Sequence, residues 1–178
     1  MQSDSGMSRR QYLQLAGATA LPAIVAGCIA YRPEEGSDGG EDDTAADTDN
    51  AAVDEWLTET DIGGDASNYD GTIIDGRDES SVQVDVGAGK AGTEFEPAAV
   101  AVSQGTTVEW VWTGDGGGHN VEAEPEGQLE ESDYEFSSGE VVTGEGETYE
   151  YTFENAGIAL YHCEPHLSIG MKGAIVVE

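Results

Sequence analysis

Three residue types that bind soft metals lie close together near the C-terminal end of this 178-residue sequence. Cys163, His166 and Met171 supply a thiolate, an imidazole and a thioether, and sulfur ligands of this kind select soft ions such as Cu(I). Pro165 stiffens the loop, and Gly170 allows it to bend back so that Met171 faces the same site. The stretch therefore predicts three ligands of a mononuclear metal site.

A second imidazole must come from the remaining histidines, because the chain has three in all. His162 precedes Cys163 directly, and adjacent side chains of a strand point to opposite faces of a sheet. His162 therefore faces away from a metal that Cys163 binds. His119 ends a run of glycines just before an apolar-containing strand, from which its ring can reach a distant loop. We predict His119, Cys163, His166 and Met171 as the ligands.

Two histidines, one cysteine and a weak axial methionine are the ligand set of the trigonal blue-copper site. Zinc is the competing ion, because cysteine and histidine also bind zinc tetrahedrally. Structural zinc sites rarely use methionine, however, and catalytic zinc keeps a position for water. The thioether thus favours copper that cycles between Cu(I) and Cu(II). In the alternative without a metal, Cys163 is a core thiol and His166 a loop residue.

The elements that must position these ligands are β-strands. Apolar and polar side chains alternate with a period of two in two segments, 107–112 and 149–154. Shorter candidate strands are separated by glycine-rich turns. They lie at 82–86, 99–102, 120–123, 141–143, 158–162 and 173–177. No helical periodicity follows residue 66, so the pattern predicts an all-β, antiparallel sandwich.

The N-terminus has the features of an export signal. Arg9 and Arg10 precede a short apolar run, as in twin-arginine signals. The sequence Val25-Ala26-Gly27-Cys28 resembles the lipobox of exported lipoproteins, in which the cysteine carries lipid after cleavage. We expect residues 1–27 to be a signal peptide and Cys28 to anchor the chain on the extracytoplasmic face of the cell membrane. A plain transmembrane anchor is the alternative. Cys163 then lacks a disulfide partner, and a lone exported thiol is prone to oxidation unless a metal occupies it.

Residues 28–65 are acidic and poor in apolar side chains, which predicts a disordered tether before a folded domain at 66–178. Within the tether, Val53 to Leu57 has the pattern of a helical turn that docks Trp56 on the domain. The whole chain has 37 acidic and 6 basic residues, a net charge of −31, which excludes binding of nucleic acid through phosphates. Because the acidic residues are spread along the chain, we interpret them as a solubility device of the halophilic kind.

The combined pattern resembles a known family. Tyr161-x-Cys163-x-Pro165-His166-x-x-x-Gly170-Met171, with His119-Asn120-Val121 about forty residues upstream, is similar to the plastocyanin-type cupredoxins, and within them to the halocyanins, acidic blue copper proteins of halophilic archaea. The resemblance covers residues 69–178. It implies a cupredoxin-like Greek-key β-sandwich of about eight strands that holds one type 1 copper.

The resemblance also implies roles for residues around the ligands. Asn120 would brace the loop that bears Cys163 by hydrogen bonding, and Pro165 would shape that loop. The ring edge of His166 would be the exposed exit for electrons. Leu167, Ile169 and the glycines at 116–118 would form an apolar rim for brief docking.

These features predict a one-electron transfer protein and not an enzyme. A copper enzyme such as a nitrite reductase needs a second copper site with further histidines, and only His162 remains. The expected partners are redox proteins, membrane respiratory complexes among them, and the expected state is a monomer. The alternatives are an extracytoplasmic copper-binding or delivery protein and an adhesive module with a structural metal.

Overall fold

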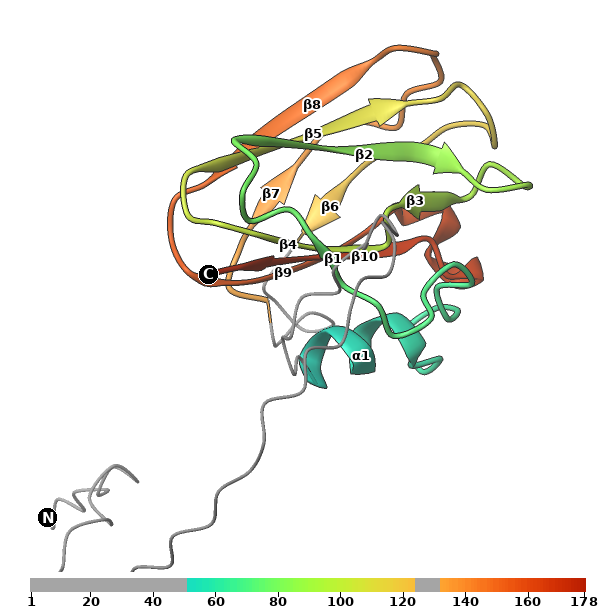
Figure 1. Ribbon diagram of the computed structural model, residues 1–178. Helices are drawn as coiled ribbons and strands as arrows, with labels where there is room; N and C mark the ends of the chain where they lie inside the picture. The colour runs from blue at the N-terminus through green and yellow to red at the C-terminus, as the bar shows by residue number, and fades with distance from the viewer. Residues whose placement is uncertain (1–50, 124–131) are drawn as a thin grey trace, which may run out of the picture. The chain divides into compact units, whose positions relative to one another are not determined.

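The structure is a computed structural model that describes residues 51–123 and 132–178, and it consists mainly of two stacked β-sheets (Figure 1). The elements in chain order are α1 (Ala51–Thr58), β1 (Ile74–Asp75), β2 (Ser81–Ala88), β3 (Glu94–Glu96), β4 (Ala99–Val102), β5 (Thr106–Trp112), β6 (Glu122–Ala123), β7 (Phe136–Ser137), β8 (Thr148–Phe153), β9 (Gly157–His162), the 3-10 helix η1 (Glu164–Ile169) and β10 (Lys172–Val177).

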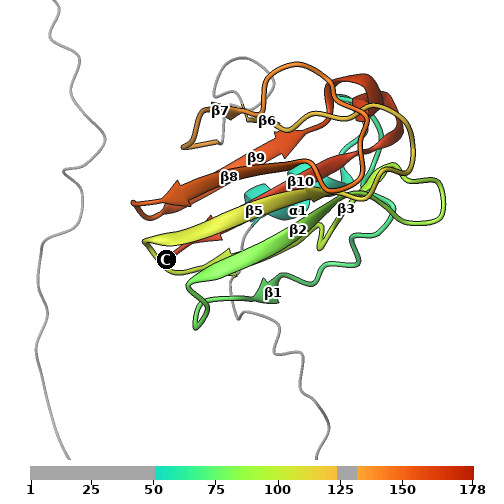
Figure 2. The same ribbon diagram turned by 90° about the horizontal axis from the view of Figure 1, so that it is seen from above.

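The strands form a sandwich, which confirms the predicted all-β fold class. One sheet has the order β1-β4-β10-β9-β6-β7, and the other has the order β3-β2-β5-β8. Figure 1 shows the two sheets as stacked layers, and Figure 2 looks onto the four-stranded sheet, with β2, β5 and β8 in front. The pairs β1–β4, β4–β10 and β2–β5 are parallel, so the sandwich is mixed and not purely antiparallel as predicted. Parallel neighbours need a crossover, which here passes through the opposite sheet, and local sequence patterns do not record that path.

The long alternating segments form strands where the sequence predicts them. The segment 141–143 instead forms an isolated bridge between Val142 and His119. The unpredicted strands β1, β3 and β7 have two or three residues each, which is too short for a period of two to be recognised.

The main core lies between the sheets and is rich in aromatic rings. Along β5 the burial alternates residue by residue, which places Trp110 at the centre. Its ring centroid lies 5.4 Å from that of Tyr161 and 5.3 Å from that of Phe136. Cys163 and Met171 belong to the same buried cluster. Two of the predicted ligands, Cys163 and Met171, are therefore part of the main core.

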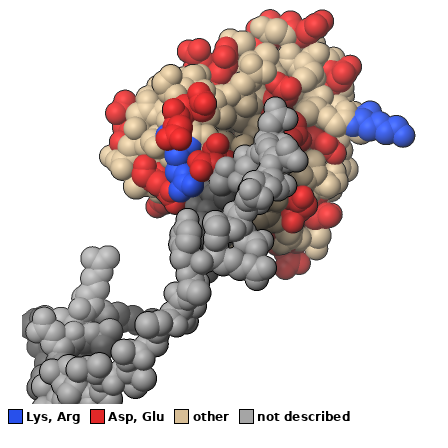
Figure 3. Space-filling model, in the orientation of Figure 1, with Lys and Arg blue, Asp and Glu red and all other residues tan. Residues whose placement is uncertain are grey.

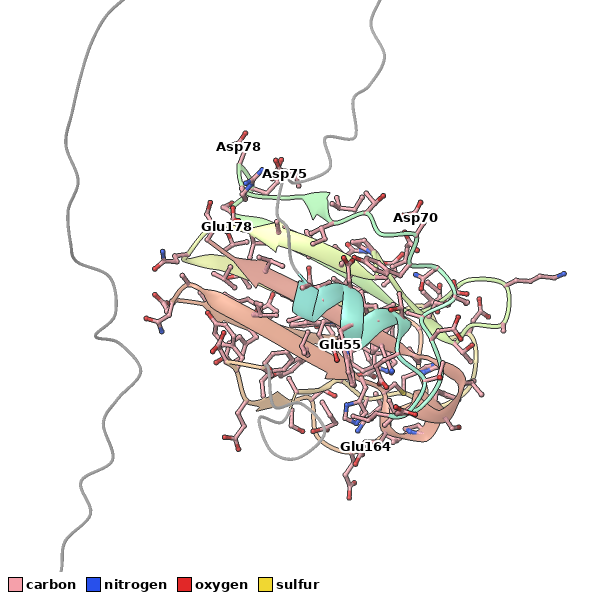
Figure 4. The ribbon with its side chains drawn as sticks, turned by 90° about the horizontal axis from the view of Figure 1, so that it is seen from below. Glu55, Asp70, Asp75, Asp78, Glu164 and Glu178 are labelled. Atoms are coloured by element: carbon pink, nitrogen blue, oxygen red, sulfur yellow. The ribbon has the colours of Figure 1, made fainter. Side chains whose placement is uncertain are left out.

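A second core covers the outer face of the six-stranded sheet, where α1 packs (Figure 4). Val53, Trp56 and Leu57 of the helix are buried. They share a cluster with apolar side chains of β4, β9 and β10. These side chains are Ala99, Ala101, Leu160, Ala174 and Val176. With one face against each core, all residues of β10 are buried.

The structure places the start of the folded part earlier than the predicted boundary at residue 66. Residues 51–58 form α1, as the Val53–Leu57 pattern predicts, and this helix is anchored through three buried apolar side chains. The acidic residues of α1 lie on its exposed side. The acidic composition of this segment therefore reflects the solvent-facing side of a helix and not disorder. The predicted signal peptide, Cys28 and the first part of the tether lie outside the described residues. Within the described residues, no helix has the length and apolar content to span a membrane.

Candidate metal centre

Three of the four predicted ligands converge in space. The Nδ1 atoms of His119 and His166 lie 3.1 Å apart, and the Sγ atom of Cys163 lies 3.6 Å from the first and 3.4 Å from the second. The circumradius of a triangle with these sides is about 2.0 Å, close to the roughly 2.0–2.3 Å over which imidazole nitrogen and thiolate sulfur bind zinc, an ion of similar size. The three side chains therefore fit around one transition-metal ion.

The loop after β9 brings Cys163 and His166 together. Cys163 has extended backbone at the N-cap of η1, and Pro165 lies in the first turn of that helix. A 3-10 helix has three residues per turn, so His166 returns to the side of Cys163. Gly170 ends the helix in the left-handed region, with a φ of 87°. The predicted shaping of the loop by Pro165 and Gly170 agrees with this geometry.

Met171 follows this loop and closes it against Cys163. The backbone N–H of Cys163 donates to the carbonyl of Met171 at 3.0 Å, and the N–H of Met171 donates to the carbonyl of His166 at 3.2 Å. The Met171 side chain is fully buried in the same core cluster as Cys163. Its role as the weak axial ligand stays a prediction that this position favours.

His119 comes from a separate loop and is fixed in one tautomer. Its Nε2 atom lies 2.9 Å from the carbonyl oxygen of Asp115. A carbonyl only accepts, so Nε2 carries the proton and Nδ1 keeps a lone pair for a metal. The bridge to Val142 holds the backbone of His119 through two hydrogen bonds of 2.9 Å, and Trp112 Nε1 donates to its carbonyl at 3.2 Å.

Asn120 joins the two ligand loops, as the family resemblance implies. Its Oδ1 accepts from the backbone N–H of Glu164 at 2.9 Å, and its Nδ2 donates to the Glu164 carboxylate at 2.7 Å. Nδ2 also donates to Glu122 at 3.1 Å, and Asn120 is fully buried. The residue after His119 is thus bonded to the residue after Cys163. The part of Glu122 and Glu164 was missed from the sequence, because carboxylates are common throughout this chain.

Burial is the largest influence on the pKa of the Cys163 thiol. It raises the pKa of Cys163 from 9.0 to about 11, although backbone N–H groups of Asn120 and His166 lower the pKa in part. Burial also lowers the pKa of His166, and the neighbouring His119 lowers it further. Near neutral pH the free site therefore holds a protonated thiol and a neutral His166 imidazole. Binding a metal requires the thiolate, so it must release the thiol proton.

His162 lies on the opposite side of the sheet, as predicted. Its ring packs edge-on against Trp56 of α1, with centroids 6.4 Å apart. It is absent from the group of metal-binding side chains formed by His119, Cys163 and His166. The alternation of side chains along β9 is therefore sufficient to separate the ligand Cys163 from its neighbour.

The surface around the site is partly as predicted. Ile169 is 58% exposed, in agreement with an apolar rim, whereas Leu167 packs in part against the second core. Val141 and Val142, which flank His119, are 46% and 38% exposed. The sequence pattern predicts a strand for these two valines, and it is the bridge between Val142 and His119 that places them beside the site. On the face that Figure 3 shows, carboxylates are scattered, as the spread of acidic residues along the chain predicts.

A two-sheet sandwich with a buried cysteine between two histidines, and with a buried methionine in the same core cluster, defines a β-protein that has the donors of a blue-copper site. Comparison with known proteins agrees with this class. The chain belongs to the plastocyanin/azurin family of copper-binding proteins, whose family model matches residues 82–178. The predicted resemblance to plastocyanin-type cupredoxins is thereby confirmed.

One relative extends the match well beyond that range. The chain is 45% identical to the halocyanin of Natronomonas pharaonis over 172 residues, which cover 97% of this chain and 98% of that protein. It is 37% identical to the plastocyanin of Scenedesmus fuscus over 101 residues, which cover 54% of this chain and 99% of that protein. Among solved structures, an amicyanin variant with Cu(I) aligns at 30% identity and a TM-score of 0.43, covering 56% of this chain and 83% of that one.

Proposed function

We propose that this protein is a one-electron carrier whose single type 1 copper is held by His119, Cys163, His166 and Met171. Copper in such a ligand set supplies a Cu(II)/Cu(I) couple. The observation that carries the proposal is the convergence of two imidazole nitrogens and one thiol within 3.1–3.6 Å of one another. The chain holds these donors on two hydrogen-bonded loops, which limits how far the site relaxes when its charge changes.

Burial of the site favours a carrier over a copper-delivery protein. His119 is 1% exposed, and Cys163 and Met171 are fully buried. Delivery requires an acceptor to reach the sulfur ligands and exchange them, and these are covered. His166 is the half-buried ligand, so its ring is the part of the site closest to a docking partner. Electron transfer needs only that edge.

The test is the visible and EPR spectrum of the full chain titrated with Cu(II) and then with a mild reductant. We expect an intense blue band with narrow copper hyperfine splitting, bleached by reduction and restored by oxidation. Cys163→Ser should abolish the colour, whereas Met171→Leu should keep it and shift the reduction potential. His162→Gln is the matched control, because its ring faces α1. A blue Cys163→Ser protein, or loss of copper in His162→Gln, would refute the ligand set.

We also propose that the carrier works on the extracytoplasmic face of the cell membrane, as a monomer anchored by lipid on Cys28. The support is the paired arginines and the lipobox-like Val25–Cys28 in the sequence. Its partners would be redox proteins, membrane respiratory complexes among them. Cys28→Ala should move the protein from the membrane fraction to the soluble one, and mass spectrometry should find lipid on residue 28. An unmodified, uncleaved N-terminus would favour a transmembrane anchor instead.

A further inference from the structure

A buried lysine links the N-terminal helix to the strand that follows the ligand loop. Lys172 is fully buried, although lysine is almost never fully buried unless it is paired. Its Nζ donates to the carbonyls of Trp56 and Glu59 at 3.2 and 3.0 Å, and to the Glu59 carboxylate at 2.8 Å. It also lies 4.5 Å from the centre of the Trp56 ring. A strand residue thus caps the C-terminal end of α1, where carbonyls lack helix partners and a positive charge is favoured.

The carboxylate of Glu59 fixes the conformation of the loop that follows α1. One of its carboxylate oxygens accepts from Lys172, and the other accepts from the backbone N–H groups of Asp61 and Ile62 at 2.8 and 3.0 Å. The N–H of Ala66 then donates to the carbonyl of Leu57 at 2.8 Å, which brings the chain back to the helix. Residues 59–66 therefore have a defined path with both ends fastened.

This loop contacts the loop Glu164–Gly170, which bears the ligand His166 and is called the ligand loop below. The N–H of Gly64 donates to the carbonyl of Leu167 at 2.9 Å. A Cβ on Gly64 would lie 2.8 Å from the backbone nitrogen of Gly170, and a Cβ on Gly170 would lie 1.9 Å from the carbonyl oxygen of Asp65. The two backbones are thus in contact without any side chain between them, and glycine on both sides is what permits this approach.

We propose that residues 51–66 form a strap that holds the loop Glu164–Gly170 in its ligand geometry, with Lys172 as the positioning residue that fastens it. This inference rests on the proposed function. The strap precedes the range 82–178 that the family model matches, so this constraint is added to the shared copper-binding part. Lys172 adjoins Met171, and its side chain faces α1, so it acts on the ligands through the backbone and through its charge.

Two variants separate the parts of this proposal. Lys172→Met keeps the length of the side chain, removes the charge and leaves the carbonyls of α1 without their donor. Gly64→Ala keeps every charge and inserts a methyl group between strap and ligand loop; the φ of residue 64 is not positive, so alanine adds no strain to its own backbone and acts only through this contact. Gly144→Ala is the matched control, because the nearest atom to its Cβ would be the Cγ of the exposed Glu147 side chain at 3.2 Å, and not backbone. Lys172→Arg tests rescue by a residue that keeps the charge.

The first measurement is amide hydrogen exchange of the full chain before copper is added. In Lys172→Met and in Gly64→Ala we expect the Met171 amide to exchange at least tenfold faster than in the parent protein, while the Trp110 amide changes little. Gly144→Ala should match the parent at both amides. Equal acceleration at both amides in the two strap variants would mean that the strap only stabilises the fold, and this outcome would overturn the proposal.

The second measurement is made on the copper-loaded proteins. Lys172→Met should lose copper to a chelator at least tenfold faster and should have a lower reduction potential, because the loss of a positive charge beside Glu59 favours the oxidised ion. Lys172→Arg should restore the potential. If the parent protein is not blue, the proposed function fails while the exchange experiment still reports on the strap. If the parent is blue and both strap variants keep its potential and copper release rate, the strap proposal alone is refuted.

Discussion

Replacing Asn120 by alanine removes the side chain that bonds the His119 loop to the Cys163 loop. The substitution removes the acceptor for the backbone N–H of Glu164, which lies at 2.9 Å. It also removes the donor to the carboxylates of Glu164 at 2.7 Å and Glu122 at 3.1 Å. A hydrogen bond within a fold contributes about 1 kcal/mol, and one to a charged group about 1.5–3 kcal/mol. Glu164 is exposed and can regain water, whereas Glu122 is 8% exposed and cannot do so fully. We therefore expect a loss of about 3 kcal/mol in the free energy of unfolding.

The assay is urea unfolding of the copper-free protein, followed by copper titration. In a heat scan, a loss of about 3 kcal/mol corresponds to a melting midpoint lower by roughly 9–15 °C for a domain of this size. Copper affinity should fall by about 10–100-fold, as is usual when a residue that orients a ligand is removed.

Asn68→Ala provides a control away from the ligands. Its amide donates to the Phe95 carbonyl at 2.7 Å and to Glu96 at 3.0 Å, at a half-exposed position. We expect it to cost about 1 kcal/mol and to leave copper affinity unchanged. If Asn120→Ala cost no more than Asn68→Ala, or if the two variants bound copper equally well, the brace between the loops would have no energetic role.

Burial and charge lead to four other expected outcomes. The pKa of the Cys163 thiol is raised to about 11, so copper uptake at pH 7–9 should release about one proton per ion, measured with an indicator dye in weak buffer. For the same reason the copper-free fold should lose stability as pH rises from 9 to 11, by at most about 2.7 kcal/mol, and a flat urea midpoint there would contradict the raised pKa. Trp110→Ala should cost about 3–5 kcal/mol in urea unfolding, because the fully buried Trp110 ring lies at the centre of the aromatic cluster and its removal leaves a cavity there; a cost below about 1 kcal/mol would contradict that packing. Hydrogen bonds from Arg77 lower the pKa of Asp75 to about 2, so Arg77→Gln should raise that pKa toward 3.8 in an NMR titration, and an unchanged value would exclude the pair in solution.

The ligand cluster could be predicted because its information is local. Cys163 and His166 are three residues apart around one turn of 3-10 helix, and the position of His162 follows from the alternation of side chains along β9. The choice of His119 needed only the small number of histidines in the chain. Short-range spacing, together with the exclusion of His162, is therefore sufficient to predict the three converging donors without knowledge of the sheet order.

The residues that hold the ligand cluster in place are harder to predict from the sequence, because their partners are distant along the chain. Lys172 and Glu59 are separated by 113 positions, and an isolated lysine at the start of an apolar strand is ordinarily read as exposed. Glu122 and Glu164 are two carboxylates among 37 acidic residues, so nothing in their types distinguishes them. Only the register of β9, which pairs Glu122 with His162, brings them to the two sides of Asn120.

One sequence signal nevertheless points to the strap, and it lies in the strands that the strap covers. Ala99–Val102 and the run from Gly173 to Val177 are apolar at every position, whereas a strand with one face in water alternates with polar residues. Both faces of these strands must therefore be covered, and the sandwich itself covers only one. The remaining face needs an apolar partner outside the strands, and Val53, Trp56 and Leu57 form the apolar face of a short acidic segment. Continuous apolar strands in the C-terminal half thus require the helix in the N-terminal half, and that requirement places residues 51–58 in the fold despite their charge.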